Sequence, residues 1–163
     1  MSNWSKLAEK MAVYESDCVA RVNHFLKVFA FAKTIAEGED LPAETREILE
    51  AAALVHDIGI RPSLEKFGRC TGKMQEENGP PVAAEMLPAC GYSPAQTERI
   101  CYLIAHHHTY DDIDGLDYQI LVEADFLVNI FEGGMEKSAV ENVKETIFRT
   151  KTGTALLTTL FLS

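Results

Sequence analysis

Apolar residues recur at steps of three and four along nearly the whole chain, which is the spacing of amphipathic helices. The clearest stretch is 16–37, where one apolar stripe is made of Cys18, Val22, Phe25, Phe29, Ala32 and Ala36. Ser16 is a favourable N-cap for this helix, and Gly38 is a natural stop. No segment shows a convincing period-two strand pattern. The pattern therefore predicts an all-α fold.

The same periodicity, together with residues that begin and end helices, predicts the remaining elements. Ser93 and Gln96 form a capping box with Pro94 at the first helical position, so a helix should run from there to the histidines at 106–108. Residues 68–81 hold three glycines and two prolines and are predicted to form a loop, after which Pro80 and Pro81 open a helix. Further helices are expected at about 42–57, 63–67, 81–90, 117–132, 136–148 and 154–162.

Composition and charge narrow the class of protein. The chain has 163 residues, of which 47% are hydrophobic and 25% charged, and this fits one globular domain over 1–163. Its 15 Lys and Arg against 25 Asp and Glu give a net charge of −10, which argues against a nucleic-acid polymer or an anionic membrane as partner. No apolar run reaches the roughly 20 residues of a membrane span. Four cysteines without a CxxC pair and the lack of a signal sequence predict a cytoplasmic protein with free thiols.

Two histidines and an aspartate sit at unusual places on the first predicted helices. His24 lies on a second apolar stripe of the helix over 16–37, although such a histidine on its own is more typical of a core residue bonded to a backbone carbonyl. His56 and Asp57 end the next helix, where the helix dipole disfavours an acid. Their side chains could both reach one ion placed beyond the helix end.

Asp125 falls on an apolar stripe of the helix over 117–132, where its carboxylate would be buried. A buried carboxylate needs a metal ion, a proton or a paired cation, so a metal ligand and a structural ion pair are both open. His107 and His108 continue the inward stripe of the preceding helix, whereas His106 falls on another side. Imidazoles and carboxylates thus gather on inward faces of four helices, as in metal sites of helix bundles.

These residues resemble the HD superfamily of metal-dependent phosphohydrolases. The match covers about residues 16–132, with the helices over 136–162 packing on that core. It rests on the order of His24, His56-Asp57 and Asp125 and on segments such as Leu-Val-His-Asp-Ile-Gly and Glu-Ala-Asp-Phe-Leu-Val. Gln75-Glu76, Gly79-Pro80-Pro81 and the segment 148–153 are similar to small stand-alone bacterial-type members without an assigned substrate.

The resemblance implies that His24, His56, Asp57 and Asp125 bind one divalent metal ion. Two imidazoles and two carboxylates suit Mn, Fe, Co, Ni, Zn or Mg. Binuclear relatives carry further histidines where this chain has His107 and His108, and another between the His-Asp pair and that cluster. Residues 58–105 contain no histidine, so a complete second metal site is not expected.

The implied reaction is hydrolysis of a phosphate ester of a small metabolite or nucleotide by a metal-activated water. Asp57 could orient the water, and His107 or His108 could protonate the leaving group. The substrate phosphate could be held by four basic residues of the segment after the His-Asp pair, Arg61, Lys66, Arg69 and Lys73. The alternative is that this segment is only a solvated loop. The alternatives are a non-catalytic metal- or nucleotide-binding regulatory module and, less favoured, a di-iron oxygenase on the same fold. The apolar C-terminal stretch should pack on the bundle or form a homodimer contact.

Overall fold

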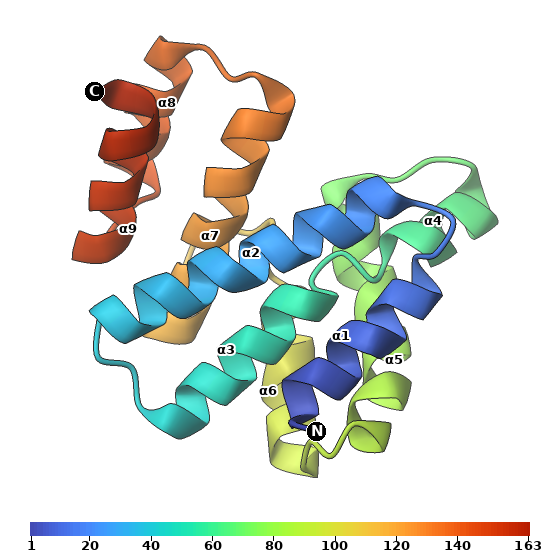
Figure 1. The fold of residues 1–163 in the computed structure, drawn as a ribbon. Coiled ribbons are helices and arrows are strands. Elements are labelled where there is room, and N and C mark those ends of the chain that lie inside the picture. Colours follow the sequence, from blue (N-terminus) through green and yellow to red (C-terminus); the bar gives the residue numbers. More distant parts are fainter.

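The computed structural model describes residues 1–163 and is helical throughout, without a strand, as the apolar periodicity predicted. Figure 1 shows the helices in chain order. The elements are α1 (Asn3–Tyr14), α2 (Val19–Gly38), α3 (Ala43–Val55), α4 (Ile60–Phe67), α5 (Gly72–Ala89), α6 (Pro94–Ile104), α7 (Leu116–Gly133), α8 (Lys137–Thr146), α9 (Lys151–Leu157) and a final π-helical turn η1 (Thr158–Leu162).

Helices α2, α3 and α7 form the centre of the molecule. Residues Leu49–Val55 of α3 are all buried, because this half of the helix packs against α2, α6 and α7. Three successive alanines there let the neighbouring helices approach closely. Most of α7 is buried as well, from Asp117 to Asp125. In Figure 1, α8 and α9 lie on one side of this centre, and α1, α4 and α5 lie on the other.

A buried acid ties the C-terminal helices to the centre. Glu123 of α7 is fully buried and accepts hydrogen bonds from the Thr150 hydroxyl at 2.6 Å and from the backbone N–H groups of Arg149 and Thr150 at 3.0 and 3.1 Å. The Gln119 side-chain amide donates to the same carboxylate at 2.7 Å. These bonds satisfy a charge that would be costly to bury alone, and they fix the start of α9 on α7.

The predicted loop at 68–81 is wrong, because residues from Gly72 onward already belong to α5, with Pro80 and Pro81 inside the helix. The Thr71 hydroxyl caps its first turn by accepting from the Met74 N–H at 3.2 Å. The glycines here serve close packing. A Cβ on Gly59, at the start of α4, would lie 2.5 Å from the Gln75 carbonyl oxygen, and Gly79 packs on the same turn.

The other helix boundaries lie closer to the predicted ones. The predicted helix over 16–37 begins at Val19 with Cys18 as N-cap, because Glu15–Asp17 form the turn that follows α1. Helix α1 was not predicted; it buries only Leu7 and Met11, one turn apart. The capping box of Ser93 is confirmed by its hydrogen bonds with Gln96. No helix is both long enough and apolar enough to cross a membrane.

Candidate metal centre

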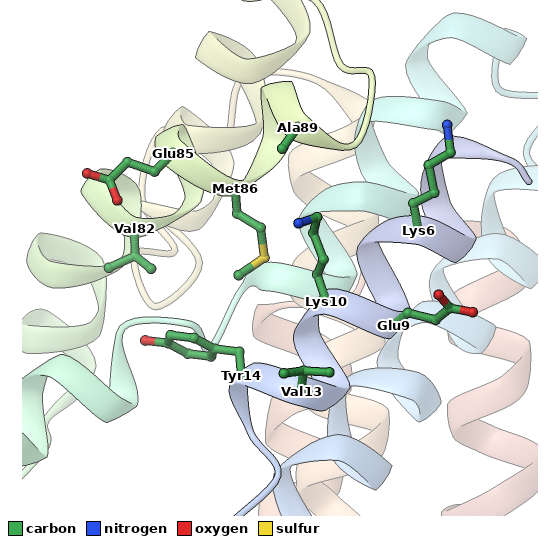
Figure 2. A pocket seen from close by; sticks show the side chains of 9 residues that line it. All are labelled: Lys6, Glu9, Lys10, Val13, Tyr14, Val82, Glu85, Met86 and Ala89. Carbon is green, nitrogen blue, oxygen red and sulfur yellow. The ribbon is translucent and has the colours of Figure 1, made fainter.

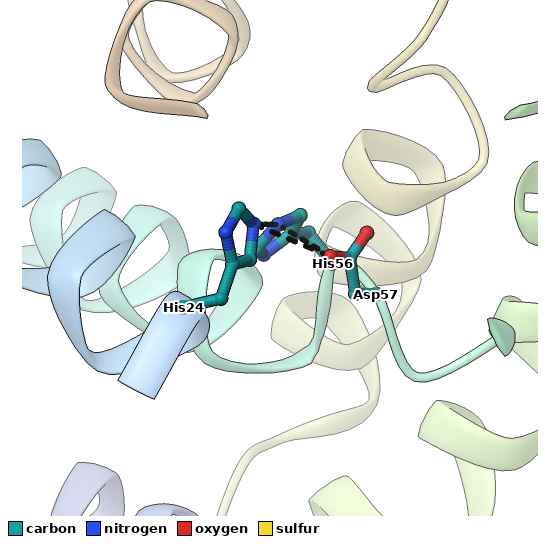
Figure 3. A group of neighbouring side chains, drawn as sticks. All are labelled: His24, His56 and Asp57. Carbon is teal, nitrogen blue, oxygen red and sulfur yellow. Dashed lines mark hydrogen bonds and ion pairs between the residues drawn. The ribbon is translucent and has the colours of Figure 1, made fainter. Parts of the chain in front are cut away.

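Three central helices bring the predicted metal ligands to one point. His24 lies in the first half of α2, His56 and Asp57 follow the end of α3, and Asp125 lies in the middle of α7. Because α2 packs on both α3 and α7, the four side chains converge although they span about a hundred positions of the chain. Figure 3 shows the His24 ring reaching from α2 toward His56 and Asp57.

The four donor atoms are close together. The Nε2 atoms of His24 and His56 lie 3.1 Å apart, and Asp125 Oδ1 lies 3.2 and 3.4 Å from them. Asp57 Oδ2 lies 3.3 Å from His24 Nε2 and 3.4 Å from His56 Nε2. Neighbouring ligands of an ion bound at about 2.0–2.2 Å are separated by about 3.0–3.5 Å, so the spacing fits one metal ion.

Hydrogen bonds on the outer side of both rings set their tautomers. His56 Nδ1 lies 2.7 Å from the Ala53 carbonyl oxygen, and His24 Nδ1 lies 3.1 Å from Glu132 Oε2. Both acceptors require an N–H on Nδ1, so in the neutral rings the Nε2 lone pairs face each other and the two carboxylates. Such a set of lone pairs needs a cation at its centre, and the donor chemistry therefore fits a metal ion.

The carboxylates of this cluster are ionised at neutral pH. Burial disfavours the charged form of Asp125, yet the neighbouring His56 and His24 hold the pKa of this carboxyl well below its usual value. The pKa of Asp57 is likewise lowered well below its usual range, against burial, by His56 and His107. Two buried negative charges thus lie within one pocket. In the metal-free protein protonated imidazole balances them, since Asp57 and Asp125 raise the pKa of His24 and of His56 against the effect of burial. A bound metal ion would take the place of those protons.

His107 and His108 lie next to the four-ligand cluster, and His106 does not. His107 Nε2 is 3.5 Å from Asp57 Oδ1, the carboxylate oxygen that faces away from His24. The Gln75 Oε1 atom lies 3.2 Å from His107 Nε2 and 2.8 Å from His108 Nε2. Burial, and then the neighbouring His107, lower the pKa of His108 to about 4. His106 instead bonds the Tyr102 carbonyl oxygen and stacks on that ring.

Asp57 therefore joins two groups of possible ligands. Asp57, His107 and His108 also offer three donor atoms within 4.8 Å of one another. The carboxamide of Gln75 contacts both histidines of this second group. Gln75 entered the resemblance but was not predicted to lie in the site, because its segment was predicted to be a loop.

A polar cavity of about 320 Å³ opens over the cluster. Three residues of the cavity wall were not predicted from the sequence: Arg21, Asn129 and Glu132. Helical phase could have found them, since Arg21 is three residues before His24, and Asn129 and Glu132 are four and seven after Asp125. The full lining is Ala20, Arg21, His24, Asp57, Ile60, Gln75, His108, Asp125, Asn129 and Glu132.

None of the four basic residues predicted to bind phosphate lines this cavity. Arg61 pairs with Asp17 and lies over the Tyr14 ring, while Lys66 Nζ is 3.4 Å from Asn78 Oδ1. Arg69 is exposed, and the Lys73 side chain is 83% exposed, 3.9 Å from Glu77. Their phosphate-binding role stays a prediction. The cation at the cavity wall is Arg21, whose Nε donates to the buried Glu15 at 2.6 Å.

A larger hollow of about 780 Å³ lies between α1 and α5, on another part of the surface. Figure 2 shows its lining, with Lys6 and Lys10 on α1 and Met86 on α5. None of the metal-cluster residues borders this hollow, so the candidate chemistry belongs to the smaller polar cavity.

Comparison with known proteins agrees with this geometry. The HD domain family model matches residues 21–143. A crystal structure of a predicted HD superfamily hydrolase from an uncultured Thermotogales bacterium shares the fold, with a TM-score of 0.68 and 23% identity. That match covers 96% of this chain and 83% of the other. No curated protein matches. Since the family model spans most of the sequence, including all four clustered residues, the chain belongs to the HD domain family.

Proposed function

We propose that this protein is a metal-dependent phosphohydrolase that acts on a phosphate ester of a small metabolite or nucleotide. The observation that carries the proposal is the cluster of His24, His56, Asp57 and Asp125. The two imidazole Nε2 atoms lie 3.1 Å apart, and each lies 3.2–3.4 Å from a carboxylate oxygen of Asp57 and of Asp125, with both rings held in the metal-binding tautomer. Membership of the HD domain family supports it, as does the similarity to a protein described as a predicted HD superfamily hydrolase.

A divalent ion held by these four residues supplies the positive charge that polarises a phosphoryl oxygen and acidifies a water. The chain adds a cation of its own, because Arg21 lies at the wall of the same cavity. Its guanidinium can bind a phosphate oxygen with charge-assisted hydrogen bonds. In a protein of net charge −10, this local cation offsets repulsion of an anionic substrate.

The leaving group needs a proton, and the proposed donors are His107 and His108. Gln75 Oε1 lies within 3.2 Å of both Nε2 atoms. Gln75 and His108 line the cavity, and His107 lies buried behind them. A phosphate dianion beside them favours the protonated form of an imidazole. Asp57 Oδ1 lies 3.5 Å from His107 Nε2, so this carboxylate can orient His107 or a water next to it.

The test is release of inorganic phosphate by metal-loaded protein from a panel of phosphate esters, with p-nitrophenyl phosphate as a general substrate. We expect activity in the wild type and in His106→Ala, the matched control whose ring lies outside the cavity. His107→Ala should lower kcat more for alkyl than for activated aryl phosphates, which need little protonation. Equal losses would remove His107 from the proton-donor role. No phosphate release from any ester by protein with a full metal complement would refute the proposal.

A further inference from the structure

An apolar crevice of about 300 Å³ lies between α2, α7 and η1. Two of the residues at its mouth are exposed, Phe131 at 75% and Leu160 at 51%. Exposed apolar side chains that gather around one hollow indicate a binding surface rather than chance. The lining consists of Lys27 with Phe31, Leu127, Val128, Phe131, Leu160 and Phe161.

The crevice and the metal cavity are neighbours along the same two helices. On α2, His24 lines the cavity, while Lys27 and Phe31 line the crevice three and seven residues later, about 5–10 Å along the helix axis. On α7, Glu132 lines the cavity and its neighbour Phe131 lines the crevice.

An ion pair forms the boundary between the two spaces. Lys27 Nζ lies 2.7 Å from Glu132 Oε1, and Glu132 Oε2 lies 3.1 Å from His24 Nδ1. A molecule whose phosphate is at the metal cluster therefore has its organic part directed either to solvent or across this ion pair into the crevice.

The chemistry of the crevice selects its occupant. Lys27 supplies the sole polar side chain of the lining, and that side chain is already paired with Glu132. The walls therefore offer no set of donors and acceptors that could read the edge of a nucleobase or the hydroxyls of a sugar. The volume is at the lower end of the roughly 300–1,000 Å³ typical of small-ligand pockets, which suits one ring system or a short alkyl chain.

We infer that the crevice binds the hydrophobic organic part of the substrate, so that the preferred substrates are phosphate monoesters of apolar alkyl or aryl alcohols. The inference rests on the proposed phosphohydrolase function. The phosphate lies at the metal cluster beside Arg21, and the apolar group crosses the Lys27–Glu132 pair to contact Phe131 and Leu160.

The test uses straight-chain alkyl phosphates from ethyl to octyl, whose leaving-group pKa values are nearly constant. We expect kcat/KM of metal-loaded protein to rise with chain length, by up to about fourfold for each methylene that becomes buried, until the crevice is full. The double variant Phe131→Ser, Leu160→Ser should lower the octyl-to-ethyl ratio of kcat/KM. The matched control Val13→Ser, an equally exposed apolar residue in the other hollow, should keep the wild-type ratio.

A second measurement separates this inference from the proposed function. Alkylphosphonates are not hydrolysed, so the dependence of their dissociation constants on chain length reports the crevice without turnover. If no ester is hydrolysed but octylphosphonate binds more tightly than ethylphosphonate, and the double variant loses the difference, the proposed reaction is wrong and the apolar site stands. Affinity independent of chain length in the wild type would overturn the inference. A second result would also overturn it: the wild type sediments as a dimer, the double variant sediments as a monomer, and the dependence of affinity on chain length is the same in both. In that case a second copy of the chain covers the crevice.

Discussion

Glu132 is a residue outside the predicted ligand set whose removal should weaken metal binding. Its carboxylate accepts the Nδ1–H of His24 at 3.1 Å and pairs with Lys27 at 2.7 Å. Burial disfavours its charge, but Lys27 and His24 still hold the pKa of Glu132 below the usual value, so it is ionised at neutral pH. An ionised acceptor fixes the tautomer of His24 and makes Nε2 a stronger donor to a metal ion.

We expect Glu132→Gln to reduce metal affinity. Substitution of such an outer partner costs about 10–100-fold in affinity, or about 1.4–2.8 kcal/mol. The Glu132 side chain is 34% exposed and thus partly screened by solvent, which favours the lower end, roughly tenfold.

The assay is calorimetric titration of metal-free protein with Zn²⁺ or Mn²⁺ in competition with a chelator. Glu141→Gln is the matched control, since it removes the same charge from an exposed position on α8. Equal affinities of the two variants would refute the argument that Glu132 acts through His24.

Two further substitutions test other parts of the account. Arg21→Ala should lower kcat/KM about ten- to hundredfold in steady-state kinetics, because it removes a charge-assisted hydrogen bond to phosphate. Lys73→Ala should leave kcat/KM nearly unchanged, because that side chain points to solvent. The reverse result would assign phosphate binding to the predicted basic segment. Gly153→Ala should lower the unfolding temperature by several degrees, because a Cβ there would lie 2.0 Å from Glu123 Oε1, while Gly133→Ala has free space and serves as control in the same thermal scan.

Periodicity and helix-end residues were enough to predict most helices. Together with the HD resemblance they also singled out the four residues that the structure brings together. Asp125 was found because a carboxylate interrupts an apolar stripe, and it is indeed buried beside two imidazoles. His56 and Asp57 were found because an acid ends a buried helix. These patterns can be read from neighbouring positions of one helix, because the face of a helix that packs in the core must be apolar and a polar residue on it stands out.

The parts that sequence analysis missed depend on contacts between distant segments. Gly79 counted toward the predicted loop at 68–81, yet the lack of a side chain on Gly59 and Gly79 lets α5 approach the start of α4. Composition alone does not separate a turn from such close packing. Gln75 was missed for the same reason. The basic segment shows another limit, because local charge does not say which way a side chain points, and Lys73 points to solvent.

The central claim is that His24, His56, Asp57 and Asp125 hold one functional metal ion. The most direct measurement is thermal unfolding of chelator-treated and metal-loaded protein, wild type against Asp125→Asn, with metal content measured in the same samples. Removal of the ion leaves two ionised carboxylates in one buried pocket with only protonated imidazoles to balance them, so we predict that the wild type loses thermal stability on chelation and regains it on loading. Asp125→Asn should bind less metal and show a smaller shift. An unchanged unfolding temperature of the wild type after complete metal removal, or equal metal content in the variant, would contradict the account.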